Sequence, residues 1–280
     1  MSLRIVLVLA ALVFNGCASP SQAHSRFIPN PADPSERVEY FVDQPEGSGP
    51  WPMIVFLHGH QNGISTPGGQ VYADWGVLKH YAGQGYLAVS VSLPGFGASG
   101  GPADFAGPKT QAAVAAVKGA LEAEGLAKPG RVLLQGVSLG AITAGLLAAQ
   151  DPDIDGLVLI SGLYDLPALL DHPRTPGAAG VRTVALSQTG GDPEALRSRS
   201  VLFQVGSIRS PALILNGARD DRTDPEQARR FAEALRAQGL TATAVIYEEH
   251  GHEIPVAVRQ PEIDAFINEV FPAHSQGRAQ

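Results

Sequence analysis

One short motif in this sequence has the pattern of a catalytic serine. Residues 136–140 read Gly-Val-Ser-Leu-Gly and lie between an apolar run, residues 131–135, and an Ala/Leu-rich stretch, residues 139–149. A serine at a tight strand-to-helix turn has its hydroxyl exposed beyond the strand end, and flanking glycines let the chain pass close to itself. Leu139 would then be the first residue of a helix, and its N–H would face a developing oxyanion. We predict Ser138 as a nucleophile.

A serine hydroxyl is a weak nucleophile without a general base, and the base needs a carboxylate that orients it. Three aspartates follow an apolar run over residues 212–216 that has the pattern of a strand. Asp220 is the first of them, just past the strand end, and we predict it as the orienting acid. Asp221 and Asp224 are alternatives, although Asp224 precedes Pro225 and fits a helix N-cap better.

Two histidines are candidates for the base. Residues 248–253 read Glu-Glu-His-Gly-His-Glu and follow a predicted strand over residues 241–247. Either His250 or His252 lies where a base at a strand end can meet the acid. Residue type and position alone leave both open.

A second His-Gly-His triplet, residues 58–60, closes the predicted strand over residues 53–58. Gly59 allows a sharp turn there, so we predict the backbone N–H of His60 as a second oxyanion donor beside that of Leu139. Histidines two apart on a strand share a face, which also fits a metal site. One triplet already supplies the candidate base and the other a candidate oxyanion donor, so we expect no metal and no cofactor.

Alternating strand and helix patterns would position these residues. Such alternation is typical of an α/β fold with a mostly parallel sheet flanked by helices. Residues 37–42 alternate like an exposed edge strand, and the helices over 225–237 and 261–270 begin with proline in the first turn. The predicted strands are 37–42, 53–58, 86–91, 131–135, 156–160, 212–216 and 241–247, and the predicted helices are 72–82, 108–124, 139–149, 225–237 and 261–270.

Residues 166–210 contain no clear strand pattern and are rich in Pro, Gly, Arg and Ser. A connection of this length is unusual inside a compact domain. We predict a cap insertion over one end of the sheet, with short helices such as residues 193–197. A plain surface loop is the alternative.

The N-terminus has the pattern of an export signal. Within residues 1–17, Arg4 is the only charged residue, and it precedes ten apolar residues, 5–14. Ten helical residues span about 15 Å, which is too short for a bilayer core of about 30 Å. A short apolar stretch after a basic residue is typical of a signal peptide.

Two processing sites compete in this region. Phe-Asn-Gly-Cys at 14–17 resembles a bacterial lipobox, so we predict a lipid on Cys17 and a periplasmic or outer-membrane-anchored lipoprotein. Cleavage after Ala23 is the alternative. Residues 18–34 are rich in Ser, Pro and Gln and are predicted to form a polar tether, and residues 35–273 a single domain.

Composition limits the function classes. The 280 residues include 20 basic and 27 acidic side chains, for a net charge of −7, and this argues against a general nucleic-acid binder. The single cysteine excludes an intramolecular disulfide framework and a Cys-rich zinc site. Hydrophobic residues make up 44% of the chain, enough for a large core.

Taken together, these motifs resemble the α/β-hydrolase superfamily over nearly the whole mature chain. The C-terminal half resembles the catalytic domain of the prolyl oligopeptidase family. This resemblance implies that Asp220 orients the base, and that the base is His252, because a glycine commonly precedes the base in this fold. The matching segments are 136–140, 148–152 (Ala-Ala-Gln-Asp-Pro), 160–165 (Ile-Ser-Gly-Leu-Tyr-Asp), 220–227 and 250–252.

The chain also departs from that family. Val137 and Ala141 replace glycines that the family often has, and His60 and Gln61 follow Gly59 where the family often has Gly-Pro. Peptidases of the family usually carry a large N-terminal propeller, which we do not expect in 280 residues. We predict an exported serine hydrolase that cleaves small esters or short peptides through an acyl-enzyme. An acyltransferase or thioesterase, or a non-catalytic binding protein, is the alternative.

Overall fold

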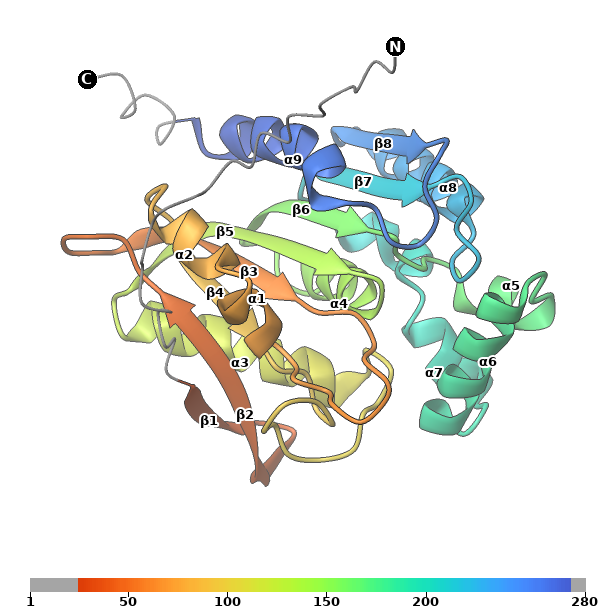
Figure 1. The fold of residues 1–280 in the computed structure, drawn as a ribbon, viewed down its shortest axis with the longest axis horizontal. Coiled ribbons are helices and arrows are strands. Elements are labelled where there is room, and N and C mark those ends of the chain that lie inside the picture. Colours follow the sequence, from red (N-terminus) through yellow and green to blue (C-terminus); the bar gives the residue numbers. More distant parts are fainter. Residues whose placement is uncertain (1–24, 273–280) are drawn as a thin grey trace, which may run out of the picture.

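The structure is a computed structural model that describes residues 25–272. Its strands are β1 Arg26–Asn30, β2 Asp33–Asp43, β3 Trp51–Leu57, β4 Leu87–Val91, β5 Ala127–Val137, β6 Ile154–Ile160, β7 Ala212–Gly217 and β8 Ala242–Tyr247. They form one eight-stranded sheet in the order β1-β2-β4-β3-β5-β6-β7-β8 (Figure 1). β1 pairs with β2 and β2 with β4 in antiparallel fashion, and all pairs from β4 to β8 are parallel. The predicted α/β class with a mostly parallel sheet is confirmed.

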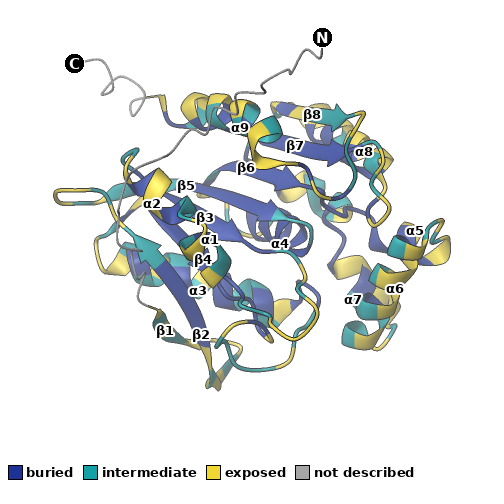
Figure 2. Ribbon diagram, in the orientation of Figure 1, coloured by how far each residue is buried: buried dark blue, intermediate teal, exposed yellow. Residues whose placement is uncertain are grey.

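The apolar runs of the central strands arise because both faces of the sheet are covered. On β3, Met53, Val55 and Leu57 belong to one core, whereas Ile54 and Phe56 belong to the core on the opposite face. Figure 2 shows the central strands as buried and the outward surfaces of the flanking helices as more exposed. A sheet with two covered faces leaves its ends as the places where a site can open.

The helices divide between these two cores. Val114, Leu146 and Phe231, from α3, α4 and α8, pack on one face. Tyr72 and Leu78, from α1 and α2, pack on the other face together with α9. The bounds are α1 Gln70–Asp74, α2 Val77–Ala82, α3 Pro108–Ala123, α4 Leu139–Ala148, α8 Pro225–Ala237 and α9 Val256–Val270.

Short helices fill the long connection between β6 and β7. They are α5 Leu166–Asp171, α6 Pro176–Thr189, α7 Pro193–Ser198 and the 3-10 helix η1 Val201–Ser207. The side chains of Asp165, Thr175 and Asp192 cap the first turns of α5, α6 and α7, respectively. Figure 1 shows α5, α6 and α7 beside the ends toward which β5, β6 and β7 point.

The structure corrects the expectation for the start of the domain. The predicted tether over 18–34 and the predicted domain start at 35 do not hold from Arg26 onward, because β1 pairs with β2. β1 occupies the sheet edge, so residues 37–42 lie in β2 and are not an edge strand. Pro29 is compatible with this position, since an edge strand tolerates the missing N–H.

Two predicted helices also differ from the structure. The helix expected over 72–82 is divided into α1 and α2 at Gly76, whose φ of 72° is in the left-handed region that interrupts a helix. The helix expected over 261–270 begins earlier, at Val256, and contains Pro261 in its interior. Packing of this helix on the sheet overrides the local signal of the proline.

The predicted signal peptide, Cys17 and the alternative cleavage site after Ala23 lie outside the described residues. The part of the tether over 18–24 lies there too. Within residues 25–272, no helix is both long and apolar enough to cross a bilayer.

Candidate active site

Ser138 occupies the turn between β5 and α4. Its φ and ψ are 53° and −113°, a conformation that costs a non-glycine residue about 1–3 kcal/mol. Its N–H donates to the Ile160 carbonyl at 2.8 Å, which ties the turn to β6. A Cβ on Gly136 would collide with the Gly140 carbonyl, and a Cβ on Gly140 with the Leu57 carbonyl. Glycine at both positions therefore allows the turn to close around the serine.

Two backbone segments adjoin Ser138. Leu139 is the first residue of α4, so its N–H has no carbonyl of a preceding turn to donate to. A Cβ on Gly59 would lie 3.3 Å from Ser138 Cβ, which shows how closely the loop after β3 approaches the serine. His60 lines the same cavity as Ser138 and Leu139. Both predicted oxyanion donors thus belong to residues on this cavity.

Asp220 and His252 are in direct contact. The His252 Nδ1 lies 3.0 Å from Asp220 Oδ1 and 2.9 Å from Oδ2. The side chains are 5% and 0% exposed. An ionised carboxylate only accepts hydrogen bonds, so Nδ1–H is the donor and Nε2 is the nitrogen left as an acceptor.

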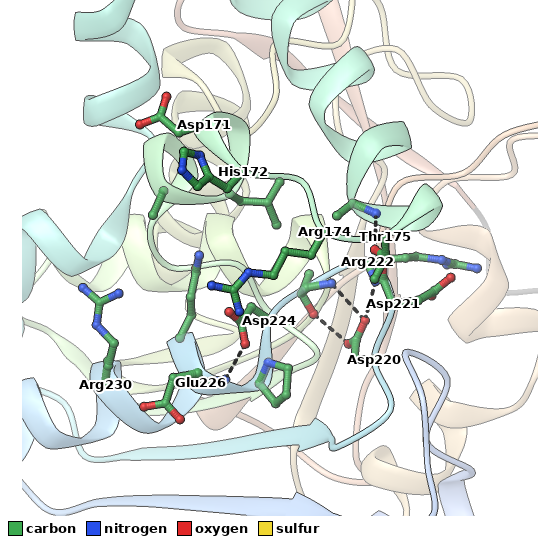
Figure 3. A pocket seen from close by; sticks show the side chains of 16 residues that line it. Asp171, His172, Arg174, Thr175, Asp220, Asp221, Arg222, Asp224, Glu226 and Arg230 are labelled. Atoms are coloured by element: carbon green, nitrogen blue, oxygen red, sulfur yellow. Dashed lines mark hydrogen bonds between the residues drawn. The ribbon is translucent and has the colours of Figure 1, made fainter.

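Further donors surround the Asp220 carboxylate, which adjoins the pocket drawn in Figure 3. The backbone N–H groups of Arg222 and Thr223 donate to Oδ1 at 2.8 and 2.9 Å. Thr223 Oγ1 donates to Oδ2 at 2.7 Å, and Asn216 Nδ2 donates to it at 3.2 Å. Burial alone would raise the pKa of Asp220, but the hydrogen bonds from His252 and Thr223 outweigh it and lower that pKa. Asp220 is therefore held in its ionised form.

The loop that carries His252 is held by a hydrogen bond from Ser161. Ser161 Oγ donates to the His252 carbonyl at 2.8 Å, and Ser161 is fully buried. Ser161 has a φ of 50° and follows β6 directly. This hydrogen bond joins the segments that follow β6 and β8, and it fixes the backbone that carries the imidazole.

Ser138 and His252 line one cavity of about 790 Å³. Among residues 25–272, neither the Ser138 hydroxyl nor His252 Nε2 has a hydrogen-bond partner. Catalytic hydrogen bonds are often long in structures without substrate and tighten when substrate binds. The arrangement leaves one nucleophilic oxygen and one basic nitrogen open to the same space.

The alternative residues lie elsewhere. Asp224 accepts from the Glu226 N–H at 2.9 Å and caps α8. Asp221 is exposed, and its backbone carbonyl accepts from Thr175 Oγ1 in the cap. The His250 ring lies beside the Tyr247 ring at 6.1 Å and does not line the cavity. Only His252 of the two histidines contacts Asp220.

His58 has a role that sequence reasoning did not assign. It is 2% exposed, its Nδ1 lies 2.7 Å from the Gly59 carbonyl, and the Leu93 N–H donates to its Nε2 at 3.1 Å. Because Nε2 accepts, Nδ1–H must donate, so the ring is neutral. Burial lowers the pKa of His58 to about 4. The neutral ring fixes the backbone just before His60.

The cavity has mainly apolar walls. The cap contributes Val181 and Val184 from α6, and the opposite side contains Val71, Trp75 and the first residues of α9. A second pocket of about 490 Å³ adjoins the other side of the Asp220 loop, and Figure 3 shows its charged lining. Its ionisable side chains are Asp171, His172, Arg174, Asp220, Asp221, Arg222, Asp224, Glu226 and Arg230.

Sequence reasoning did not identify Asn216, Ser161 and Thr223, which hold Asp220 and the His252 loop. Ser161 and Thr223 do lie in segments 160–165 and 220–227, which match the family, but the resemblance assigned them no role, and Asn216 lies in a predicted strand. Within residues 25–272, no three His, Cys, Asp or Glu side chains are grouped so that they could hold a metal ion.

Comparisons with known proteins identify the family of this chain. The sequence pattern of the prolyl oligopeptidase family matches residues 106–272, and that of the X-Pro dipeptidyl-peptidase (S15) family matches residues 36–173. Dipeptidyl aminopeptidase BIII of Pseudoxanthomonas mexicana is 27% identical over 217 residues, which are 72% of this chain and 30% of that protein. Esterase LipC of Mycobacterium tuberculosis is 25% identical over 277 residues, 90% of this chain and 67% of that protein.

Solved structures show the same fold. A puromycin hydrolase superposes with a TM-score of 0.74 at 24% identity, covering 89% of this chain and 39% of that one. Acetyl xylan esterase 1 from Thermoanaerobacterium superposes with a TM-score of 0.70 at 16% identity, covering 92% and 86%. The chain thus spans less than half of the peptidases it matches. The predicted resemblance is confirmed: this chain belongs to the prolyl oligopeptidase family and has the α/β-hydrolase fold.

Proposed function

We propose that this protein is a serine hydrolase that cleaves ester or amide bonds of small substrates through an acyl-enzyme. The observation that carries the proposal is the buried Asp220–His252 pair, in which His252 lines the same cavity as the strained Ser138 turn. The three side chains follow β7, β8 and β5, and parallel strands bring their carboxyl ends to one edge of the sheet.

In the first half of the reaction, His252 Nε2 accepts the proton of the Ser138 hydroxyl while Oγ bonds to the substrate carbonyl carbon. The carbonyl electron pair moves to the oxygen, and the N–H groups of Leu139 and His60 donate to that oxyanion. The electron pair then returns, the bond to the leaving group breaks, and the leaving group takes the proton from Nε2. An acyl group remains on Ser138 Oγ.

In the second half, water takes the place of the leaving group. His252 Nε2 accepts a proton from the water as its oxygen attacks the acyl carbon, and the oxyanion forms at the same donors. Collapse releases the acid and returns the proton to Ser138. Asp220 stays ionised throughout, holds the imidazole by Nδ1–H and stabilises the imidazolium form.

The walls of the cavity support small substrates with an apolar portion. Val181 and Val184 of the cap face the same space as Ser138, so the cap over 166–210 helps to select the substrate. The relatives named above include peptidases and esterases, and both ester and amide bonds therefore belong in the test.

The test is labelling with a fluorophosphonate probe together with kinetics on 4-nitrophenyl esters and on aminoacyl and prolyl 4-nitroanilides. Wild type should be labelled at Ser138 and should hydrolyse at least one substrate class. Ser138→Ala should remove the labelling and lower kcat by several orders of magnitude. Ser198→Ala, which alters a serine in α7 that does not line the cavity, is the matched control. Labelling that persists in Ser138→Ala would contradict the proposal.

For localisation, we propose that the protein is exported and carries a lipid on Cys17. The support is the basic start, the ten apolar residues and the Phe-Asn-Gly-Cys sequence at 14–17. Mass spectrometry of the protein from a bacterial membrane fraction should find an acylated N-terminus at Cys17, absent from Cys17→Ser. A mature N-terminus at His24 would contradict the anchor and leave the catalytic proposal unaffected.

A further inference from the structure

The cavity beside Ser138 differs in charge from the rest of the chain. Although the net charge of the protein is −7, the formally charged side chains that line the cavity are Arg222, Glu253 and Arg259. Two positive charges therefore face one negative charge where the substrate binds. Asp220 adds no free charge to this space, because its carboxylate is buried and bonded to His252.

The two arginines have different partners. Arg222 Nη1 donates to Glu253 Oε1 at 3.2 Å, and both side chains are at least half exposed. Arg259, in the second turn of α9, is half-buried, and among residues 25–272 its guanidinium has no hydrogen bond and no ion pair. Among the described residues that line the cavity, the one carboxylate is thus that of Glu253, which is hydrogen-bonded to Arg222 and not to Arg259.

Two tyrosines beside Arg259 supply no negative charge. Tyr72 uses its hydroxyl to donate to the Leu57 carbonyl at 3.1 Å, and the hydroxyl of Tyr81 accepts from Gln260 at 2.9 Å. Burial raises the pKa of both tyrosines, so both are neutral. Burial also lowers the pKa of Arg259, and it outweighs the opposing effects of the neighbouring tyrosines and of the Glu253 carboxylate.

A half-buried cation without a direct ion pair is unfavourable in the free protein. An anion entering the cavity would relieve this cost, and a guanidinium matches a carboxylate with two parallel hydrogen bonds. The same wall carries Val71 and Trp75, and the cap wall carries Val181 and Val184. Within the described part of the chain, the cavity thus presents one guanidinium group without an ion pair, that of Arg259, among apolar side chains.

We propose that Arg259 is a specificity-determining residue that binds a carboxylate of the substrate, so that the protein prefers anionic esters or amides with an apolar portion over their neutral counterparts. This inference rests on the proposed hydrolase function. It adds the substrate class: small acyl compounds or short peptides that bear a free carboxylate.

Two matched pairs of esters test the proposal with the full-length wild-type protein. In the first pair the acyl group ends in a carboxylate or a carboxamide (4-nitrophenyl hemiadipate and 4-nitrophenyl adipamate). In the second pair the leaving group carries the difference (4-acetoxybenzoate and 4-acetoxybenzamide). The ratio of kcat/KM, anionic over neutral, should exceed one in at least one pair. A ratio of one or less in both pairs overturns the proposal.

Variants then identify the residue responsible. Arg259→Gln should lower the preferred ratio by about tenfold to hundredfold, the range expected for a lost charged hydrogen bond. Arg259→Lys keeps the charge without the planar fork and should give an intermediate ratio. Arg229→Gln removes the same charge from an exposed site on α8 and should leave the ratio unchanged. An equal loss in Arg229→Gln, or no loss in Arg259→Gln, also overturns the proposal.

The outcomes separate this inference from the function on which it rests. If wild type hydrolyses the neutral esters and shows no anionic preference, only the role of Arg259 fails. If it hydrolyses no ester or amide and Ser138 is not labelled by a fluorophosphonate, the hydrolase proposal fails as well. If Arg259→Gln does not fold, as judged by thermal unfolding, the wild-type ratio and Arg259→Lys still decide the question.

Discussion

The triplet His-Gly-His occurs twice in this chain, at residues 58–60 and 250–252, and the two copies have different surroundings. In the first, His58 is the buried histidine and both of its ring nitrogens are bonded within the protein. In the second, His252 is the buried histidine, and only its Nδ1 has a partner among the described residues. Identical local sequence thus produces a structural histidine in one place and a ring with one available nitrogen in the other.

The distance from the strand end explains this difference. β3 ends at Leu57, so His58 follows at once and lies against the next strand connection at Leu93. β8 ends at Tyr247, and the chain turns before His252 reaches Asp220 after β7. A histidine with both nitrogens bonded cannot transfer a proton without breaking a bond, whereas a histidine with Nε2 open to a cavity can.

The largest expected effect tests the second triplet. His252→Ala should lower kcat on a 4-nitrophenyl ester by about 10⁴–10⁶, because members of a triad act as a unit. His250→Ala, the matched change two residues away, should alter kcat less than about threefold, since His250 does not line the cavity. Equal losses in the two variants would contradict the assignment of different roles within this triplet.

The second prediction concerns Asp220, which binds His252 Nδ1 and has no counterpart beside His58 among the described residues. Asp220→Asn should lower kcat by about 10⁴, because an amide in place of the carboxylate favours the wrong imidazole tautomer. Asp221→Asn, an exposed neighbour, is the control and should stay within about threefold of wild type. Steady-state kinetics with circular dichroism as a check on folding measures both. A near-normal kcat in Asp220→Asn would show that the contact with His252 is not catalytic.

Local sequence predicted the strand ends well, because a tight turn requires glycines and buried strands require apolar runs. It predicted Asp220, the family resemblance added His252 as its partner, and these side chains are in contact. It did not predict Ser161, whose hydrogen bond to the His252 carbonyl joins residues 91 positions apart. Contacts of that kind depend on the order of strands in the sheet, and no short segment of the chain contains them.

The helix starts show the same limit. Pro225 and Pro261 carry the same local signal for a first helical turn, and α8 does begin at Pro225. α9 begins five residues before Pro261, and Val258 in this earlier part packs against the same core as Ile263 and Phe266. A proline marks a permitted helix start, whereas tertiary packing decides whether the helix begins there.

A stability measurement tests the first triplet. The pKa of His58 is lowered to about 4 in the folded protein from 6.5, so between these pH values the unfolded chain binds the extra proton. The free energy of unfolding should therefore fall as the pH drops from 6.5 toward 4, by about 3 kcal/mol from this residue. His58→Gln cannot be protonated. Urea unfolding should find the variant less stable than wild type at pH 7.5 and that difference smaller at pH 4.5 by about this amount. An unchanged difference would contradict the neutral, buried state of His58.

The smallest effect concerns His60, which lines the cavity with its side chain but is proposed to act through its backbone N–H. His60→Ala keeps that N–H, so kcat/KM should fall by no more than about fivefold, the effect of lost contacts alone. The pH dependence of kcat should keep its shape, because the His60 imidazole carries no proton in the proposed reaction. A loss of about 10² or more, or an altered pH profile, would mean that the imidazole itself takes part. The first triplet would then supply a catalytic side chain, as we propose for the second, and the two copies would differ less than their hydrogen bonds suggest.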